Sequence, residues 1–216
     1  MHHNAVNNLK DILNEVNLIT SNCKIIAVSK TFPYEQIEPL LKDGHLHFGE
    51  NKVQEAVTKW TSIKKTYPNL QLHMIGKLQN NKVKFAVQLF DYIHSLDNIK
   101  LAEKISTEQK KINKNLHIFI QVNIGNESQK NGVNLDNLKE FYRKCIDDFG
   151  LNIVGLMCIP PHSDNSKIYF DQMAELNKDL NLNQLSMGMS SDYLVAIKCG
   201  STYVRIGSKI FGNRAK

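Results

Sequence analysis

Ile25-Ile26-Ala27-Val28-Ser29-Lys30 is the stretch of this chain that decides its fold. The run is apolar and β-branched up to the serine, and it stops at Thr31-Phe32-Pro33. A short run that is apolar on both faces is typical of a parallel strand buried between two layers of helices or side chains. The sequence therefore predicts a buried parallel strand that ends at Lys30.

Similar runs recur along the chain, with amphipathic stretches between them. The predicted strands are Ile25–Ser29, Leu46–Glu50, Leu72–Gly76, Tyr92–Leu96, His117–Ile124, Ile153–Ile159, Leu185–Met189 and Thr202–Ile206. Val6, Leu9, Leu13 and Val16 stand at helical spacing before the first of them. This alternation predicts an α/β fold, a single (β/α)8 TIM-type barrel with an N-terminal helix, as one domain over residues 1–216. A doubly wound open sheet is the alternative, because periodicity does not show whether a sheet closes.

Composition narrows the class of protein. Hydrophobic residues make up 42% of the chain and charged residues 22%, as in ordinary globular proteins. The net charge is +6, but the lysines are dispersed and no arginine-rich stripe occurs, so no nucleic-acid partner is expected. No apolar run is long enough to cross a membrane. The start, Met1-His2-His3-Asn4, lacks the features of a signal peptide, and a cytoplasmic location is expected.

The cysteines Cys23, Cys145, Cys158 and Cys199 are scattered, without a C-x-x-C pair. Such spacing argues against a zinc knuckle or a redox motif, and we expect reduced, mostly buried thiols. Cys158 stands at the end of the sixth predicted strand, and whether it approaches a ligand is left open.

Lys30 stands where barrels and doubly wound sheets place their chemistry, at the carboxyl end of a strand. Partial desolvation would lower the proton affinity of its amine and make it a nucleophile toward an aldehyde. A lysine that extends from the strand end into solvent is the simpler alternative.

The last two predicted strands lead into small residues, in Met189-Ser190-Ser191 and Gly207-Ser208. Backbone amides converge at such junctions and favour a phosphate, although a plain turn with a helix cap is the alternative. A nucleophilic Lys30, a phosphate site and Arg205 together match pyridoxal 5′-phosphate, which carries an aldehyde, a phosphate and a ring nitrogen. If Arg205 faces that nitrogen, its fixed charge opposes protonation and weakens the ring as an electron sink, which argues against transaminase chemistry.

Longer motifs give a resemblance to a known family. They are Ala27-Val28-Ser29-Lys30, Phe48-Gly49-Glu50-Asn51-Lys52-Val53-Gln54-Glu55, Ile75-Gly76-Lys77-Leu78-Gln79-Asn80-Asn81-Lys82, Gly155-Leu156-Met157, Leu185-Ser186-Met187-Gly188-Met189-Ser190, Val204-Arg205-Ile206-Gly207-Ser208 and Phe211-Gly212-Asn213-Arg214. In this order they resemble the pyridoxal-phosphate homeostasis protein family, which is related to the N-terminal barrel of alanine racemase, a fold-type III pyridoxal-phosphate enzyme. The resemblance covers the chain from about Ile25 to Arg214.

The resemblance implies a barrel that holds pyridoxal phosphate as a Schiff base on Lys30. It also implies that Arg205 lies near the pyridine nitrogen, that Asn51 lies close to the cofactor, and that Met189-Ser190 and Gly207-Ser208 contact the phosphate. The implied role is vitamin B6 and amino-acid or keto-acid homeostasis without an established catalytic activity. Apo-enzymes that receive the cofactor are possible partners, and we expect a monomer, with a dimer left open.

A weak racemase-like enzyme of fold type III is the second hypothesis. Racemisation needs a second base opposite the lysine, and in alanine racemase a C-terminal domain supplies it. The chain ends soon after the eighth predicted unit, so no such domain is expected. Tyr193 and Tyr203 are the candidate substitutes, but their places in a helix and a strand predict that they are packed.

A metal-dependent hydrolase is the third hypothesis. His45 and His47 form an H-x-H pair, and His73 and His94 fall on the next two predicted strands. However, His45 begins its strand, at the end opposite to the catalytic one, and no strand-end aspartate completes the set. We therefore predict no metal site.

Overall fold

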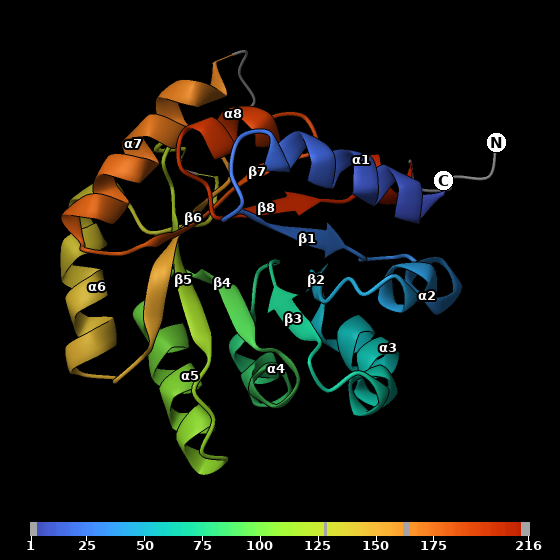
Figure 1. Cartoon of the computed structure of the whole chain (residues 1–216). Helices are drawn as coiled ribbons and strands as arrows, with labels where there is room; N and C mark the ends of the chain where they lie inside the picture. Colours follow the sequence, from blue (N-terminus) through green and yellow to red (C-terminus); the bar gives the residue numbers. More distant parts are fainter. Residues whose placement is uncertain (1–3, 128, 162–164, 213–216) are drawn as a thin grey trace.

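The strand predicted at Ile25–Ser29 is β1 (Lys24–Val28) of a closed barrel in the computed structural model. β1 pairs in parallel with β2 (His47–Glu50) on one side and with β8 (Tyr203–Ile206) on the other. Because the first and last strands are partners, the sheet forms a ring in chain order, as Figure 1 shows. The predicted barrel is confirmed, and the open-sheet alternative is wrong.

The structure describes residues 4–127, 129–161 and 165–212. The chain start at Met1–His3 and the motif residues Asn213 and Arg214 lie outside the described residues.

Every predicted strand is present, and no strand end differs from the prediction by more than two residues, the usual uncertainty of a strand end. The other strands are β3 (Gln71–Met74), β4 (Tyr92–Leu96), β5 (His117–Val122), β6 (Ile153–Cys158) and β7 (Gln184–Met189). The helices are α1 (Ala5–Asn17), α2 (Tyr34–Lys42), α3 (Val53–Thr66), α4 (Val83–Leu89), α5 (Ile99–Lys111), α6 (Leu138–Asp147), α7 (Ser166–Asp179), α8 (Tyr193–Lys198) and α9 (Ser208–Phe211), with short 3-10 turns at Asn80–Lys82 and Leu135–Asn137. The predicted N-terminal helix is α1.

Two apolar layers hold the strands in place. Ile25, Ala27 and their equivalents on the other strands pack outward against the helices. Ile26 packs inward with aromatic side chains, Tyr92 and Tyr203 among them, and fills the centre of the barrel. Since side chains alternate along a strand, the inward row that contains Ile26 continues to Lys30 at the carboxyl end.

α1 ties the two ends of the chain together. It packs against α2, α8 and α9, and Figure 1 shows it beside α8, over β1 and β8. Asn8 Nδ2 donates to the carbonyl oxygen of Ile210 at 2.9 Å, and the hydroxyl of Tyr193 donates to Glu15. These contacts join the first helix to the helices that follow β7 and β8.

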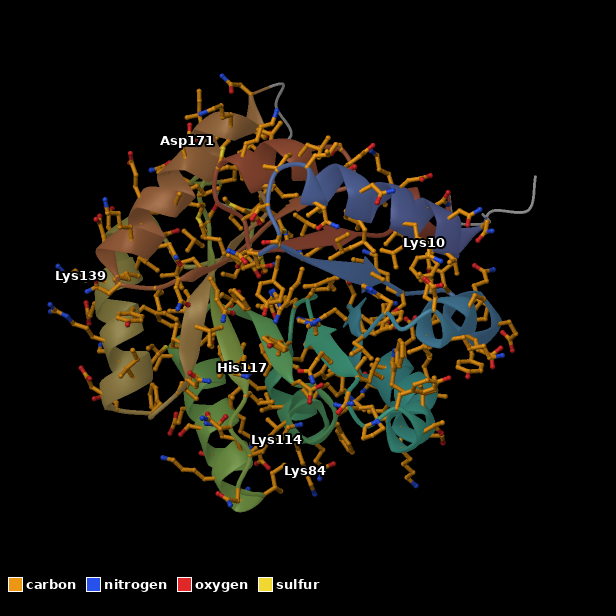
Figure 2. All side chains as sticks on the ribbon, viewed as in Figure 1. Lys10, Lys84, Lys114, His117, Lys139 and Asp171 are labelled. Carbon is orange, nitrogen blue, oxygen red and sulfur yellow. The ribbon has the colours of Figure 1, made fainter. Side chains whose placement is uncertain are left out.

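Lysines stand on several sides of the described molecule. Figure 2 shows Lys10, Lys84 and Lys139 on different sides of the molecule, and they belong to α1, α4 and α6. Among the helices that the structure describes, none combines the length and the apolar character needed to cross a membrane.

Candidate functional site

A cavity of about 560 Å³ opens at the carboxyl ends of the strands. Its volume is in the range of ordinary small-molecule sites. The residues that line it are Val28, Lys30, Phe32, Asn51, Ile75, Ile159, Met189, Ser190, Ser191, Arg205, Gly207, Ser208 and Gly212. Every residue of the predicted binding set is among them, so the structure brings the whole set together.

Lys30 is half-buried and leaves β1 on the inward face. The next residue, Thr31, has a φ of 67°, an uncommon left-handed conformation for a β-branched residue. The chain turns sharply there, away from the barrel axis. This turn leaves the lysine side chain at the wall of the cavity, as its strand-end position predicted.

A buried polar cluster lies behind Lys30. We call Ser29, Glu50, Glu55, Lys59 and Trp60 the Glu50 cluster. The oxygen Oε1 of Glu50 accepts hydrogen bonds from Ser29 Oγ at 2.8 Å, Lys59 Nζ at 3.0 Å and Trp60 Nε1 at 2.9 Å. Because Glu50 is fully buried, its charge depends on these donors for compensation.

The Glu50 cluster also binds the backbone on both sides of Lys30. Lys59 donates to the carbonyl oxygen of Ser29 at 2.9 Å, and Glu55 accepts the backbone N–H of Thr31. Glu50 and Glu55 stand in one of the family motifs, and the sequence alone predicts no role for them. The signal that could have found them is their place, at the end of a strand and in the first turn of the next helix.

Arg205 closes the inner wall of the cavity and is only 5% exposed. Its NH1 group donates to the carbonyl oxygen and to the hydroxyl of Ser186, at 2.6 and 2.7 Å, and its NH2 group donates to the carbonyl oxygen of Cys158 at 2.8 Å. Its other N–H groups have no acceptor among the described residues. These bonds hold the guanidinium of Arg205 against the cavity wall, and its remaining N–H groups can donate to a ligand.

Cys158 contributes its backbone to this wall, and its thiol is fully buried among apolar residues. Burial raises the pKa of that thiol to about 12, so the group stays protonated at neutral pH. The role of Cys158 that the sequence left open is therefore that of a carbonyl acceptor for Arg205.

Asn51 is held against the cavity by a close backbone approach. A Cβ atom on Gly76 would come within 2.4 Å of the carbonyl oxygen of Asn51, so only glycine fits there. The side-chain oxygen Oδ1 of Asn51 is buried and has no hydrogen-bond partner in the described structure. An unsatisfied buried amide at a cavity wall is a group that a ligand can complete.

The turn after β7 exposes the small residues at the cavity. The pairing of β7 with β8 shifts in register between Ser186 and Met189, and Gly188 has a φ of +92°. The N–H of Met189 donates to Asp192 Oδ1 at 2.7 Å, and α8 begins at Tyr193. Ser190 and Ser191 therefore face the cavity from this turn.

The turn after β8 lies beside it. α9 begins at Ser208, with Gly207 as its cap residue. The N–H groups of Ile210 and Phe211 donate to the carbonyl oxygen of Gly207, which leaves those of Ser208 and Lys209, at the start of α9, without an intrahelical acceptor. Together the two turns offer hydroxyl and backbone N–H donors to an anion.

The histidines of the third hypothesis lie inside the barrel, below the cavity. Nδ1 of His47 lies 3.0 Å from Nε2 of His73, and Nδ1 of His73 lies 2.9 Å from Nε2 of His94. Their ring nitrogens are therefore paired with one another instead of converging on one point. No group of His, Cys, Asp or Glu able to hold a metal ion was found in residues 4–127, 129–161 and 165–212. β2 begins at His47, so the expectation that His45 begins its strand is wrong.

The two tyrosines considered as a second base are packed, as predicted. Tyr193 lies in α8 and Tyr203 in β8, and both are almost fully buried. Burial raises the pKa of each phenol above its ordinary value. Neither residue lines the cavity.

Residues 4–215 match the family described as alanine racemase, N-terminal domain. A protein of Aquifex aeolicus (strain VF5) named pyridoxal phosphate homeostasis protein is 40% identical over 203 residues, 89% of this chain and 88% of that protein. A protein of Vibrio cholerae with the same name is also 40% identical, over 205 residues, 90% of this chain and 86% of that protein. The chain belongs to the pyridoxal phosphate homeostasis protein family.

Solved structures agree with this family assignment. PipY of Synechococcus elongatus PCC7942, determined with PLP bound, superposes on this family member with a TM-score of 0.87. The two are 31% identical, and the match covers 96% of this chain and 100% of PipY. Alanine racemase of Clostridium difficile 630 superposes with a TM-score of 0.73 at 15% identity, over 97% of this chain and 58% of the racemase. That second likeness shows the shared barrel fold.

Proposed function

We propose that this protein binds pyridoxal 5′-phosphate as a Schiff base on Lys30 and serves in vitamin B6 and amino-acid or keto-acid homeostasis. The observation that carries the proposal is the single cavity that unites Lys30, Arg205 and the turns after β7 and β8. PipY, a structural relative determined with PLP bound, supports the same ligand.

The residues at the cavity fit the chemistry of this cofactor. Pyridoxal phosphate supplies an aldehyde that condenses with amines, and Lys30 offers the amine at the cavity wall. Ser190, Gly207 and Ser208 offer hydroxyl and N–H donors for the phosphate. The unsatisfied amide of Asn51 offers a polar contact near the lysine.

Arg205 affects whether the pyridine nitrogen of the cofactor is protonated. A guanidinium only donates hydrogen bonds, so its spare N–H groups suit a ring nitrogen that accepts. Its positive charge opposes protonation of that nitrogen. Because an unprotonated ring stabilises carbanions poorly, Arg205 suits a protein that stores the cofactor more than one that performs transaminase chemistry.

Delivery to apo-enzymes would follow from the open cavity. Ile159 and Met189 line its edge and are 41% and 36% exposed, so the ligand has a route to solvent on this side. If loaded protein transfers cofactor to an apo-aminotransferase faster than the cofactor is released to an excess of a free scavenging amine, delivery is direct. Transfer at the release rate would contradict direct delivery.

The test of binding is the visible absorption spectrum of the full chain with pyridoxal phosphate, followed by borohydride reduction and peptide mapping. We expect a Schiff-base band and an adduct on Lys30. Lys30→Ala should fold and lose the adduct, whereas Lys77→Ala, an exposed lysine after β3, should keep it. A trappable adduct that survives in Lys30→Ala would refute the assignment of Lys30, and absence of any band would refute binding.

Addition of alanine to the loaded protein separates storage from the racemase-like alternative. A band that is unchanged by alanine supports a storage protein. A band that shifts, together with loss of α-deuterium from labelled alanine, would establish the racemase-like enzyme instead.

A further inference from the structure

A continuous line of hydrogen-bonding side chains crosses the inside of the barrel, from Arg205 to the opposite end. Arg205 NH1 donates to Ser186 Oγ at 2.7 Å, and Ser186 Oγ lies 2.8 Å from His94 Nδ1. His94 Nε2 then lies 2.9 Å from His73 Nδ1, and His73 Nε2 lies 3.0 Å from His47 Nδ1. We call Ser186, His94, His73 and His47 the histidine line. Its members come from β7, β4, β3 and β2.

The guanidinium of Arg205 determines which group donates and which accepts in each hydrogen bond of the histidine line. Since Arg205 only donates, Ser186 Oγ must accept, and the single hydroxyl proton of Ser186 is left to donate. His94 Nδ1 is its acceptor at 2.8 Å. In the reverse arrangement, with His94 donating, the proton of the fully buried Ser186 would have no acceptor among the described residues, and a buried hydroxyl without an acceptor is unfavourable.

The same donor-to-acceptor direction holds for the hydrogen bonds between the histidines. Burial lowers the pKa of His73 and His94 well below the ordinary value and that of His47 to about 4, so all three rings are neutral at pH 7. A neutral imidazole has one donor and one acceptor. With Nδ1 of His94 accepting, its Nε2 donates to His73, and Nε2 of His73 donates to His47. All three rings are therefore expected as the tautomer that carries its proton on Nε2.

Aromatic stacking holds two of these rings in place. His73 stacks on Tyr92 with centroids 4.3 Å apart and an interplanar angle of 16°, and His94 stacks on Phe119 at 4.3 Å and 21°. Rotation of either ring would break both a stack and the hydrogen bonds on its two nitrogens. The line is thus supported by packing as well as by its own bonds.

We propose that the histidine line is a one-way hydrogen-bond relay that positions Arg205 for the ring nitrogen of the cofactor. Its residues act through Arg205 and do not line the cavity themselves. The reference to the cofactor rests on the proposed function, whereas the direction of the line and its hold on Arg205 do not.

The first experiment measures the line in the full chain without cofactor. Two-bond ¹H–¹⁵N correlation spectra of the histidine rings should show the Nε2-protonated tautomer for His47, His73 and His94. A protonated Nδ1 on His73 or His94 would overturn the proposed direction. The side-chain N–H signals of Arg205 should be sharp and protected from exchange with water.

Ser186→Ala tests the hold on Arg205. It should broaden the Arg205 signals, release His94 from a single tautomer and weaken pyridoxal-phosphate binding by about tenfold, the change that accompanies loss of one hydrogen bond to a charged group. Ser186→Thr keeps the hydroxyl and should restore the signals. Tyr92→Phe alters the same interior without breaking the line and should leave the Arg205 signals unchanged.

The outcomes separate the two proposals. Unchanged Arg205 and His94 signals in Ser186→Ala would overturn the relay, whatever the protein binds. Absence of cofactor binding by the unaltered protein would overturn the proposed function and leave the relay to be judged by the spectra alone. If Ser186→Ala changes the signals but neither the affinity nor the absorption band of bound cofactor, the line holds Arg205 for another purpose and the positioning role is refuted.

Discussion

Ser29 and Glu50 are joined by a 2.8 Å hydrogen bond between hydroxyl and carboxylate, and both side chains are fully buried. This bond lies directly behind the strand end that carries Lys30. Lys59 reinforces it with bonds to the Glu50 carboxylate and to the Ser29 carbonyl oxygen. The backbone on both sides of Lys30 is therefore bound by a buried charged cluster. We expect this cluster to contribute to the stability of the folded protein and to position the amine of Lys30.

Glu50→Gln tests the charge of this cluster. Glutamine keeps the shape of the side chain but leaves Lys59, whose side chain is 10% exposed, without its main buried counter-charge. We expect a loss of unfolding free energy on the order of 3 kcal/mol, as for other broken buried pairs, measured by urea denaturation. Glu140→Gln removes a carboxylate from an exposed pair with Lys144 and should cause no measurable change. Equal effects of the two substitutions would contradict a special role for the cluster.

Gly76→Ala tests the close approach that places Asn51. The new Cβ atom would collide with the backbone of Asn51, so we expect a loss of roughly 1–3 kcal/mol, as for other overpacked sites, and weaker cofactor binding. Gly207→Ala is the matched control for stability alone, because its Cβ atom would lie 3.4 Å from Val28, an ordinary contact. Melting curves of both variants give the comparison of stability, and a cofactor titration of Gly76→Ala against the unaltered protein measures binding. A fully stable Gly76→Ala protein with unchanged binding would show that Asn51 is not held by this contact.

Stability should fall as the solution is made acidic, because of the buried histidines. His73 and His94 have pKa values well below 6.5 in the folded protein, mainly through desolvation, whereas in the unfolded chain they titrate near that value. As the pH falls through 6.5 the unfolded state binds more protons than the folded state, so the folded state loses stability. The loss should approach roughly 1.4 kcal/mol per pH unit for each ring.

Urea denaturation between about pH 7.5 and about pH 5 measures this loss, in a range above that of most carboxylates. His47→Gln removes one further histidine whose pKa is lowered to about 4, and its stability should fall less steeply. A free energy of unfolding that stays level over this range would mean that the rings are not buried as neutral groups.

Thiol reactivity should distinguish Cys199 from the other cysteines. Cys199 is partly exposed, whereas Cys23, Cys145 and Cys158 are buried and have pKa values raised to about 12. With a disulfide reagent at neutral pH, we expect slow modification of Cys199 alone in the folded protein and rapid modification of all of them in denaturant. The Cys199→Ser protein should be unreactive until it unfolds. Rapid labelling of Cys158 in the folded state would contradict its burial behind Arg205.

The sequence predicted the barrel well, because parallel strands buried on both faces leave uninterrupted apolar runs such as the one before Lys30. It also predicted which residues meet at the cavity, since the carboxyl ends of all strands lie at one end of a barrel. The strands and the places of Lys30, Arg205 and the two turns follow from period and position, whereas the place of Asn51 at the cavity is implied by the family resemblance. These predictions needed no knowledge of which side chains touch.

The Glu50 cluster and the histidine line could not be predicted in this way. In the sequence, Glu50 at the end of its strand cannot be distinguished from an exposed helix-capping residue. Only the packing of α3 shows that Trp60 and Lys59 bind its carboxylate. The sequence does show histidines on neighbouring strands, but an inward row of imidazole rings suits a metal ion as well as a hydrogen-bonded line. The distances between the ring nitrogens distinguish a hydrogen-bonded line from a metal site, and these distances cannot be derived from the spacing of the histidines along the sequence.

The pairing of β1 with β8 also bears on how the protein is made. Lys30 emerges from the ribosome before seven of the eight strands, whereas the wall and turn that complete its cavity, at Arg205 and Ser208, are synthesised only with and after the eighth strand. A nascent chain that lacks its eighth strand has an open ring and no pocket. If the cofactor binds as proposed, loading has to wait until β8 and the turn after it have been translated, and a product truncated before β8 would carry the lysine without being able to hold the vitamin.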